Sequence, residues 1–145
     1  MISDDLSGYE IKSDLDTFDR FSNQVHAYNR VFDRVTLVIG PALADAAPRV
    51  IPTWWGLAVA RRDERSNVSI EWSRPARRND LQKATAIASL LWRDEASQVL
   101  HAIGLSSRAR APRAEMFEAL CSALDLESLK AHVLTRLVQR SLRSA

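Results

Sequence analysis

The feature that most constrains the fold is a strand, a helix and a second strand within residues 8–40. Residues 8–13 alternate apolar and polar side chains, the period of a β-strand. Residues 34–40 form an apolar, β-branched run, typical of a strand covered on both faces. Between them a helix is predicted to begin at Asp16 or Thr17. It carries an apolar stripe spaced by three or four positions, made of Phe18, Phe21, Val25, Tyr28 and Phe32. Together these segments predict a βαβ unit with parallel strands.

Within residues 8–13, Tyr9 and Ile11 point to one face of the strand, while Glu10 and Lys12 point to the other. A carboxylate, helped by the Ile11 carbonyl, offers the hard oxygen ligands that Mg2+ prefers. A neighbouring ammonium can orient water or stabilise charge on a phosphate. The pair therefore fits phosphodiester hydrolysis. An ion pair on an exposed strand is the alternative.

On the predicted helix, a polar row made of Arg20, Gln24 and Tyr28 lies at positions i, i+4 and i+8. Arg20 and Gln24 flank the apolar stripe on one side, and Tyr28 closes its edge. Polar side chains are therefore expected beside the buried face of the helix.

Three segments, residues 10–14, 24–28 and 32–40, resemble the core of the PD-(D/E)XK nuclease superfamily, which has the restriction-endonuclease-like fold. Within it, they look like a group of small bacterial proteins. The resemblance implies a deoxyribonuclease that hydrolyses DNA with Mg2+ or Mn2+. It gives Glu10 the role of metal ligand and Lys12 that of positioning the attacking water. Gln24 and Tyr28, matching a Q-x-x-x-Y element, complete the catalytic set.

One departure from the superfamily pattern separates two hypotheses. The metal-binding aspartate on the preceding strand has no match here, because Asp4 and Asp5 read as turn residues. Either of them could substitute only if the turn bent back toward Glu10. The chain is therefore expected to begin inside a strand and to be an incomplete nuclease. The competing hypothesis is a non-catalytic nucleic-acid-binding or interaction protein with a nuclease-like fold.

Charge points to DNA as a partner. Lys and Arg number 20 against 18 Asp and Glu, for a net charge of +2. Four arginines are candidates for contacting nucleic acid, although a solvated loop surface explains the same bases: Arg20, Arg74, Arg77 and Arg78. A homodimer is also expected. No apolar run reaches the roughly 20 residues that cross a bilayer, and no signal peptide begins the chain, so the expected location is cytoplasmic.

The remaining sequence predicts a hairpin over residues 54–61 and 68–72, followed by helices over 80–103, from Pro112, and from Leu126 or Glu127. Trp54, Trp55 and Trp72 are expected to pack in the core or at the sheet edge, with base stacking as the alternative. The predicted fold is α/β, a small mixed sheet built on a βαβ unit, with C-terminal helices. A single domain is expected over residues 1–145, comprising an α/β core (1–74) and a helical extension (79–145). A helix-turn-helix formed by the last two helices is a less favoured alternative.

Overall fold

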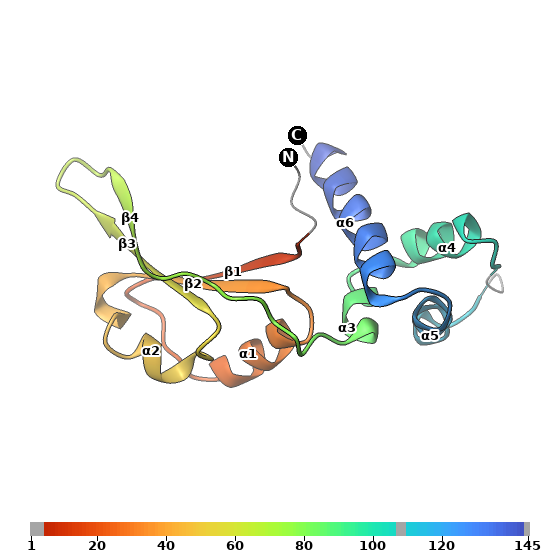
Figure 1. Cartoon of the computed structure of the whole chain (residues 1–145). Coiled ribbons are helices and arrows are strands. Elements are labelled where there is room, and N and C mark those ends of the chain that lie inside the picture. Colours follow the sequence, from red (N-terminus) through yellow and green to blue (C-terminus); the bar gives the residue numbers. More distant parts are fainter. Residues whose placement is uncertain (1–4, 107–109, 144–145) are drawn as a thin grey trace. The chain divides into compact units, whose positions relative to one another are not determined.

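A computed structural model describes residues 5–106 and 110–143 of the chain. The chain divides into two compact units, one formed by Asp5–Leu81 and the other mainly by the residues from Gln82 onward (Figure 1). The predicted fold class is confirmed, because a mixed four-stranded sheet is followed by C-terminal helices. The single domain over residues 1–145 stays a prediction.

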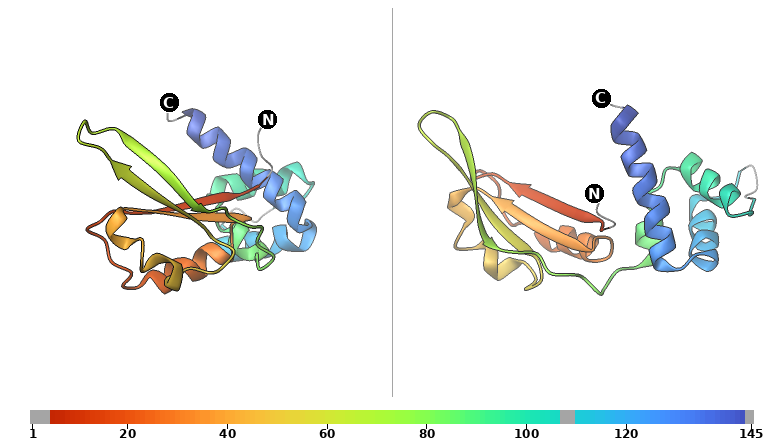
Figure 2. Two further views of the ribbon diagram at one scale, coloured as in Figure 1. Left: turned by 60° about the vertical axis from the view of Figure 1, so that its left-hand side comes forward. Right: turned by 45° about the horizontal axis from the view of Figure 1, so that its top comes forward.

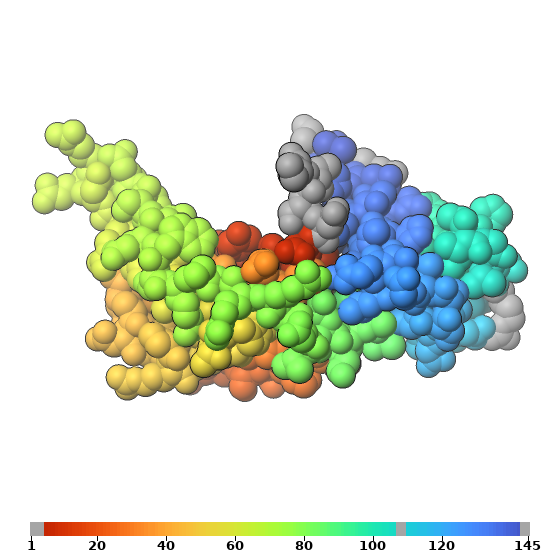
Figure 3. All heavy atoms as spheres, viewed as in Figure 1, coloured from red at the N-terminus to blue at the C-terminus, as the bar shows by residue number. Residues whose placement is uncertain are grey.

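The sheet of the first unit has the order β1-β2-β3-β4. Strands β1 (Ser7–Lys12), β2 (Arg34–Ile39) and β3 (Gly56–Arg62) are parallel, and β4 (Val68–Arg74) returns antiparallel to β3. The predicted parallel βαβ unit and the hairpin are therefore confirmed. The hairpin extends past the end of β2, so that its tip projects from the unit as an arm (Figure 3).

The core of this unit lies on one face of the sheet. Helices α1 (Phe21–Asn29) and α2 (Ala47–Val50), with the short 3-10 helix η1 (Pro41–Leu43), lie on that face (Figures 1 and 2). The apolar residues of the predicted helical stripe pack against the buried side chains of β2 and β3. Trp55 is fully buried among them, and its Nε1 donates a 2.9 Å hydrogen bond to Asn29 Oδ1.

Helix α1 begins four or five residues later than predicted, at Phe21. The short polar residues expected to cap it bond locally instead. The Asp16 carboxylate accepts hydrogen bonds from the Ser13 amide and hydroxyl, and the Thr17 hydroxyl bonds to Asp19. Such side chains satisfy the backbone in turns as readily as at helix ends. Arg20, with φ of 60°, makes the final left-handed step into the helix.

The second unit contains α3 (Ala84–Ala88), α4 (Arg93–Ala102), α5 (Arg113–Ala123) and α6 (Leu126–Arg143). The continuous helix predicted over residues 80–103 is wrong, because the chain breaks after α3 and starts again at Arg93. The Glu95 carboxylate caps this new start by accepting the Trp92 N–H at 2.7 Å. None of the described helices is both long and apolar enough to cross a membrane.

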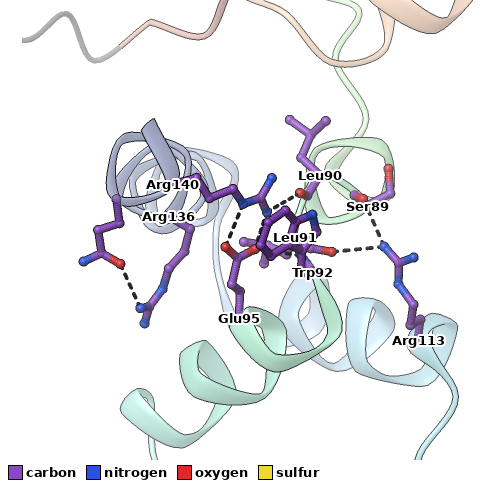
Figure 4. Close-up of polar contacts among 9 residues, drawn as sticks. Ser89, Leu90, Leu91, Trp92, Glu95, Arg113, Arg136 and Arg140 are labelled. Carbon is purple, nitrogen blue, oxygen red and sulfur yellow. Dashed lines mark hydrogen bonds and ion pairs between the residues drawn. The ribbon is translucent and has the colours of Figure 1, made fainter. Parts of the chain in front are cut away.

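Two arginines hold the α3–α4 connection (Figure 4). Arg140 of α6 forms a two-pronged hydrogen-bonded ion pair with Glu95, donates to the Leu90 carbonyl, and stacks over the Trp92 ring at 4.2 Å. Arg113 of α5 donates to the carbonyl of Leu91 at 3.0 Å. We call these contacts of Arg140 and Arg113 with residues 90–95 the clasp. The clasp uses Arg140 for contacts inside the unit, and Lys130 of α6 is buried beside Glu127. A helix-turn-helix needs exposed basic residues on its recognition helix. In α6, two of the basic residues make internal contacts instead.

The clasp predicts a loss of stability in acid. Arg140, then the Trp92 amide, holds the pKa of Glu95 below its ordinary value of 4.5. Because the folded-state pKa is lowered, the stabilisation is fully present above about pH 4.5 and disappears as pH falls through the folded-state value. Thermal unfolding from pH 6 to pH 3 should show this fall. The Glu95→Gln variant should begin about 2 kcal/mol less stable and lose less stability over that range. Parallel curves would contradict the prediction.

Candidate functional site

The four residues predicted as catalytic come together on the helix-covered side of β1. Both oxygens of the Glu10 carboxylate are bonded to α1: Gln24 Nε2 donates to one at 3.0 Å and the Tyr28 hydroxyl to the other at 2.7 Å. Lys12 Nζ lies 3.6 Å from Glu10 Oε1. The Glu10 and Lys12 side chains are 12% and 11% exposed. We call these four residues the Glu10 cluster.

The strand register explains why the cluster forms. Glu10 lies beside Leu37 and Lys12 beside Ile39, so both polar residues share the face on which the core packs. Gln24 and Tyr28 are one turn apart on α1 and reach the same carboxylate. The Tyr28 ring stacks on Trp55 at 5.8 Å, and Lys12 Nζ lies 5.2 Å from the Phe21 ring centroid. The cluster therefore joins α1 to the outer strand of the sheet.

The cluster changes the acidity of Tyr28. Burial raises the pKa of its phenol to about 12, and the hydrogen bond and charge of Glu10 act in the same direction. A phenolate here would lose its solvation and would face a carboxylate. Tyr28 is therefore held as a neutral hydrogen-bond donor, rather than as a base, at physiological pH.

The donors present do not fit a Mg2+ or Mn2+ ion as they stand. Glu10 is the one carboxylate of the cluster, and both of its oxygens accept hydrogen bonds. Of the nearby acids, Asp14 accepts the Ala42 amide and Asp16 binds Ser13. Within residues 5–106 and 110–143, no group of three His, Cys, Asp or Glu is placed to hold a metal. The metal and the catalytic roles of the cluster stay predictions, and Asp4 lies outside the described residues.

The four arginines predicted to contact nucleic acid make different contacts in the structure. Arg74 donates to the carbonyls of Trp55 and Pro52, and Arg77 to that of Thr53. Arg78 Nη2 lies 3.9 Å from Asp33, and Arg20 is exposed at the start of α1. Three of the four thus support the local fold. Their contact with nucleic acid stays a prediction.

Sequence reasoning missed the opposite face of the sheet. No helix of residues 5–81 covers it, and several large apolar side chains are exposed there, including Tyr9 (59%), Ile11 (75%) and Trp72 (59%). The strand registers define this open face by the following residues: Tyr9, Ile11, Arg34, Thr36, Val38, Ala58, Ala60, Arg62, Val68, Ile70 and Trp72. The alternation of Val68, Ile70 and Trp72 in β4 indicates an apolar face of the strand. Alternation alone does not tell which face of the sheet is covered.

Small residues form the middle of the open face. Thr36, Gly56 and Ala58 lie between Tyr9 and Trp72 in the sheet and are buried, and Ala76 packs close to Gly56. Both rings line a hollow of about 210 Å³, together with Arg34. Arg34 is fixed by Asp5 and by the Ala76 carbonyl, and its side chain remains 42% exposed. Two aromatic walls and a guanidinium therefore meet on one surface.

The comparisons with known proteins correct the functional prediction. No curated protein and no solved structure matches the chain. The family described as "Bacteriophage P4 protein cII" matches residues 1–144, and no nuclease family does. The assignment to the PD-(D/E)XK superfamily and the Mg2+-dependent hydrolysis of DNA are therefore wrong. The physical reason for the error is that E-x-K and Q-x-x-x-Y residues meet equally well when they fasten a helix to a strand. Since the match spans nearly every residue, the chain belongs to the Bacteriophage P4 protein cII family.

Proposed function

We propose that this protein binds DNA, and that single-stranded DNA lies across the open face. The supporting observation is the pair of exposed rings, Tyr9 and Trp72, that line one hollow together with Arg34. Bases of a single strand stack on such rings, because every base has a π-face and the contact does not depend on sequence. Bases in a duplex are already stacked, so a single strand fits this surface better.

Charge favours the same ligand. The described strand positions on the open face include no Asp or Glu, whereas Arg34 and Arg62 lie near its two ends. Arginine grips phosphate oxygens with a planar fork and also stacks on bases. Aromatic side chains would hold the bases, while Arg62 and the exposed part of Arg34, which is also ion-paired with Asp5, contact the backbone phosphates. Two carboxylates lie at the margin. Asp5 is ion-paired with Arg34, and Asp14, in a second hollow near Arg62, accepts the Ala42 amide.

A homodimer belongs to the same proposal, because two copies would hold more nucleotides than one. The cytoplasmic location, any catalytic activity and the Mg2+ or Mn2+ ion expected from the sequence stay predictions.

The proposal predicts that Trp72 carries much of the affinity for single-stranded DNA. Trp72→Leu should weaken binding of a fluorescent oligothymidine by about 5-fold to 150-fold, since a base stacked on an aromatic ring contributes roughly 1–3 kcal/mol. Trp72→Phe should retain most of the affinity, because it keeps a ring at the same position. Fluorescence anisotropy at fixed low salt measures both variants, and a duplex of equal length should bind the unchanged protein more weakly.

Leu15→Ala is the matched control, because Leu15 is also an exposed apolar residue but lies outside the open face. Its affinity should equal that of the unchanged chain. Equal affinities for Trp72→Leu and Trp72→Phe, or tighter binding of the duplex, would contradict the proposal. Absence of binding to any DNA would overturn the proposal as well.

A further inference from the structure

Strand β4 forms an unprotected edge of the sheet. It pairs with β3 on one side, and no described strand pairs with it on the other. Soluble proteins usually blunt such an edge with proline, lysine, a very short strand or a covering segment. The seven residues of β4 contain no proline or lysine, and six of them are exposed. The edge is therefore open to another strand.

The backbone direction along β4 follows from its turn. Asp63 N–H donates to the Asn67 carbonyl at 3.0 Å, which makes residues 63 and 67 a hydrogen-bonded pair. Hydrogen-bonded and non-hydrogen-bonded pairs alternate along an antiparallel ladder, so Ser69 and Glu71 direct their backbone groups toward β3. Val68, Ile70 and Trp72 consequently direct theirs outward. Three residues of the open face thus offer the free donors and acceptors of the edge.

Two copies related by a twofold axis can pair only in certain registers. The pairing must be antiparallel, and each residue with an outward backbone must meet another of the same kind. With the axis at Glu71, two carboxylates would lie directly opposite each other, which is destabilising. With the axis at Ile70, Ile70 meets its copy, Val68 meets Trp72, and Ser69 meets Glu71. The second register places apolar residues opposite apolar residues and separates the like charges.

We propose that β4 pairs with β4 of a second copy of this chain, antiparallel and centred on Ile70. The two four-stranded sheets then form one eight-stranded sheet. A twofold axis perpendicular to the sheet places both open faces on the same side, so the Trp72 rings of the two copies flank the junction. This pairing specifies the homodimer of the proposed function. The pairing of β4 with β4 requires no DNA. The pairing can therefore be disproved while DNA binding holds, and DNA binding can be disproved while the pairing holds.

Cysteine cross-linking tests the register. The native Cys121 is first replaced by alanine, so that a single cysteine remains in each variant. Ile70→Cys should form a covalent dimer on mild oxidation, because paired residues lie about 5.5 Å apart between Cα atoms, inside the range for a disulfide. Glu71→Cys is the matched control. In this register its copy lies roughly 8 Å away, given a rise of about 3.4 Å per residue and strands about 4.8 Å apart, so it should stay uncrosslinked.

The mass in solution tests the edge itself without DNA. The unchanged chain should have twice the 16.3 kDa of one copy. Ile70→Pro removes an outward N–H and should shift the protein to a monomer, whereas Ile70→Thr keeps that N–H and the β-branch and should remain dimeric. Circular dichroism of both variants should match that of the unchanged chain. A monomeric unchanged chain, a dimeric and folded Ile70→Pro variant, or cross-linking through Glu71→Cys in place of Ile70→Cys would each overturn the proposal.

Discussion

Trp55→Ala is expected to lower the free energy of unfolding of the α/β unit by about 4 kcal/mol. The indole is fully buried and lies against a group of rings, with centroids 6.0 Å from Phe21 and 5.8 Å from Tyr28. Removing it leaves a cavity, and it also leaves Asn29 Oδ1 without its hydrogen-bond donor. Few other substitutions in this unit would remove so much packing at once.

Urea unfolding followed by far-ultraviolet circular dichroism would measure this loss. Trp54→Ala is the matched control, because Trp54 precedes it in the sequence but is only partly buried against the same core. We expect Trp54→Ala to lose less than half as much stability. Trp55→Phe should fall between the two, since it keeps a ring but loses the N–H donor. Equal losses at positions 54 and 55 would contradict the packing described for the core.

Glu10→Ala is expected to lower the free energy of unfolding by about 3 kcal/mol. The substitution removes the common acceptor of Gln24 and Tyr28 and the ionic partner of Lys12, and unpaired polar groups at a partly buried site destabilise by roughly 1–3 kcal/mol each. Glu10→Gln keeps an acceptor oxygen and should lose less. This result would identify the Glu10 cluster as a fastening between α1 and β1.

The same variant should change the ionisation of Tyr28. Its pKa of about 12 should fall toward the ordinary 10.0 in Glu10→Ala, but not reach it, because burial is the larger cause of the shift. Absorbance near 295 nm reports phenolate formation, and a Tyr9→Phe background removes the signal of the other tyrosine. In the unchanged chain, stability should be lost as pH rises from about 10 through 12, since the folded-state pKa is the higher one. An unchanged Tyr28 titration in Glu10→Ala would show that the hydrogen bond does not form in solution.

The strands and the residues of the Glu10 cluster could be predicted because local patterns determine both. The alternation in residues 8–13 gave Glu10 and Lys12 a common face, and the spacing of Gln24 and Tyr28 gave them a common side of α1. Those patterns determine where the residues of the Glu10 cluster lie, but they do not determine what the residues do. A carboxylate that accepts two hydrogen bonds can hold a helix or support chemistry, and the family match corrected the choice that the resemblance suggested.

Other features depend on contacts that a local pattern does not contain. The apolar spacing of residues 80–103 continues across the break before α4, because those side chains face a core on both sides of it. Arg140, which contacts the connection at this break, lies 45 residues beyond Glu95 in the sequence. Exposure of Trp72 likewise depends on which face of the sheet the helices cover, which its alternation with Val68 and Ile70 leaves open.

The clasp at Glu95 also sets an order of events during synthesis. Every pairing of the four-stranded sheet lies within residues 7–74, so the α/β unit has all of its strands before most of the helical unit has been made. The turn between α3 and α4 receives its contacts from Arg140 last, because Arg140 is translated long after both helices. Until then Glu95 lacks its two-pronged partner, and a message truncated before residue 140 would yield a sheet with all its strands and a helical unit without that ion pair.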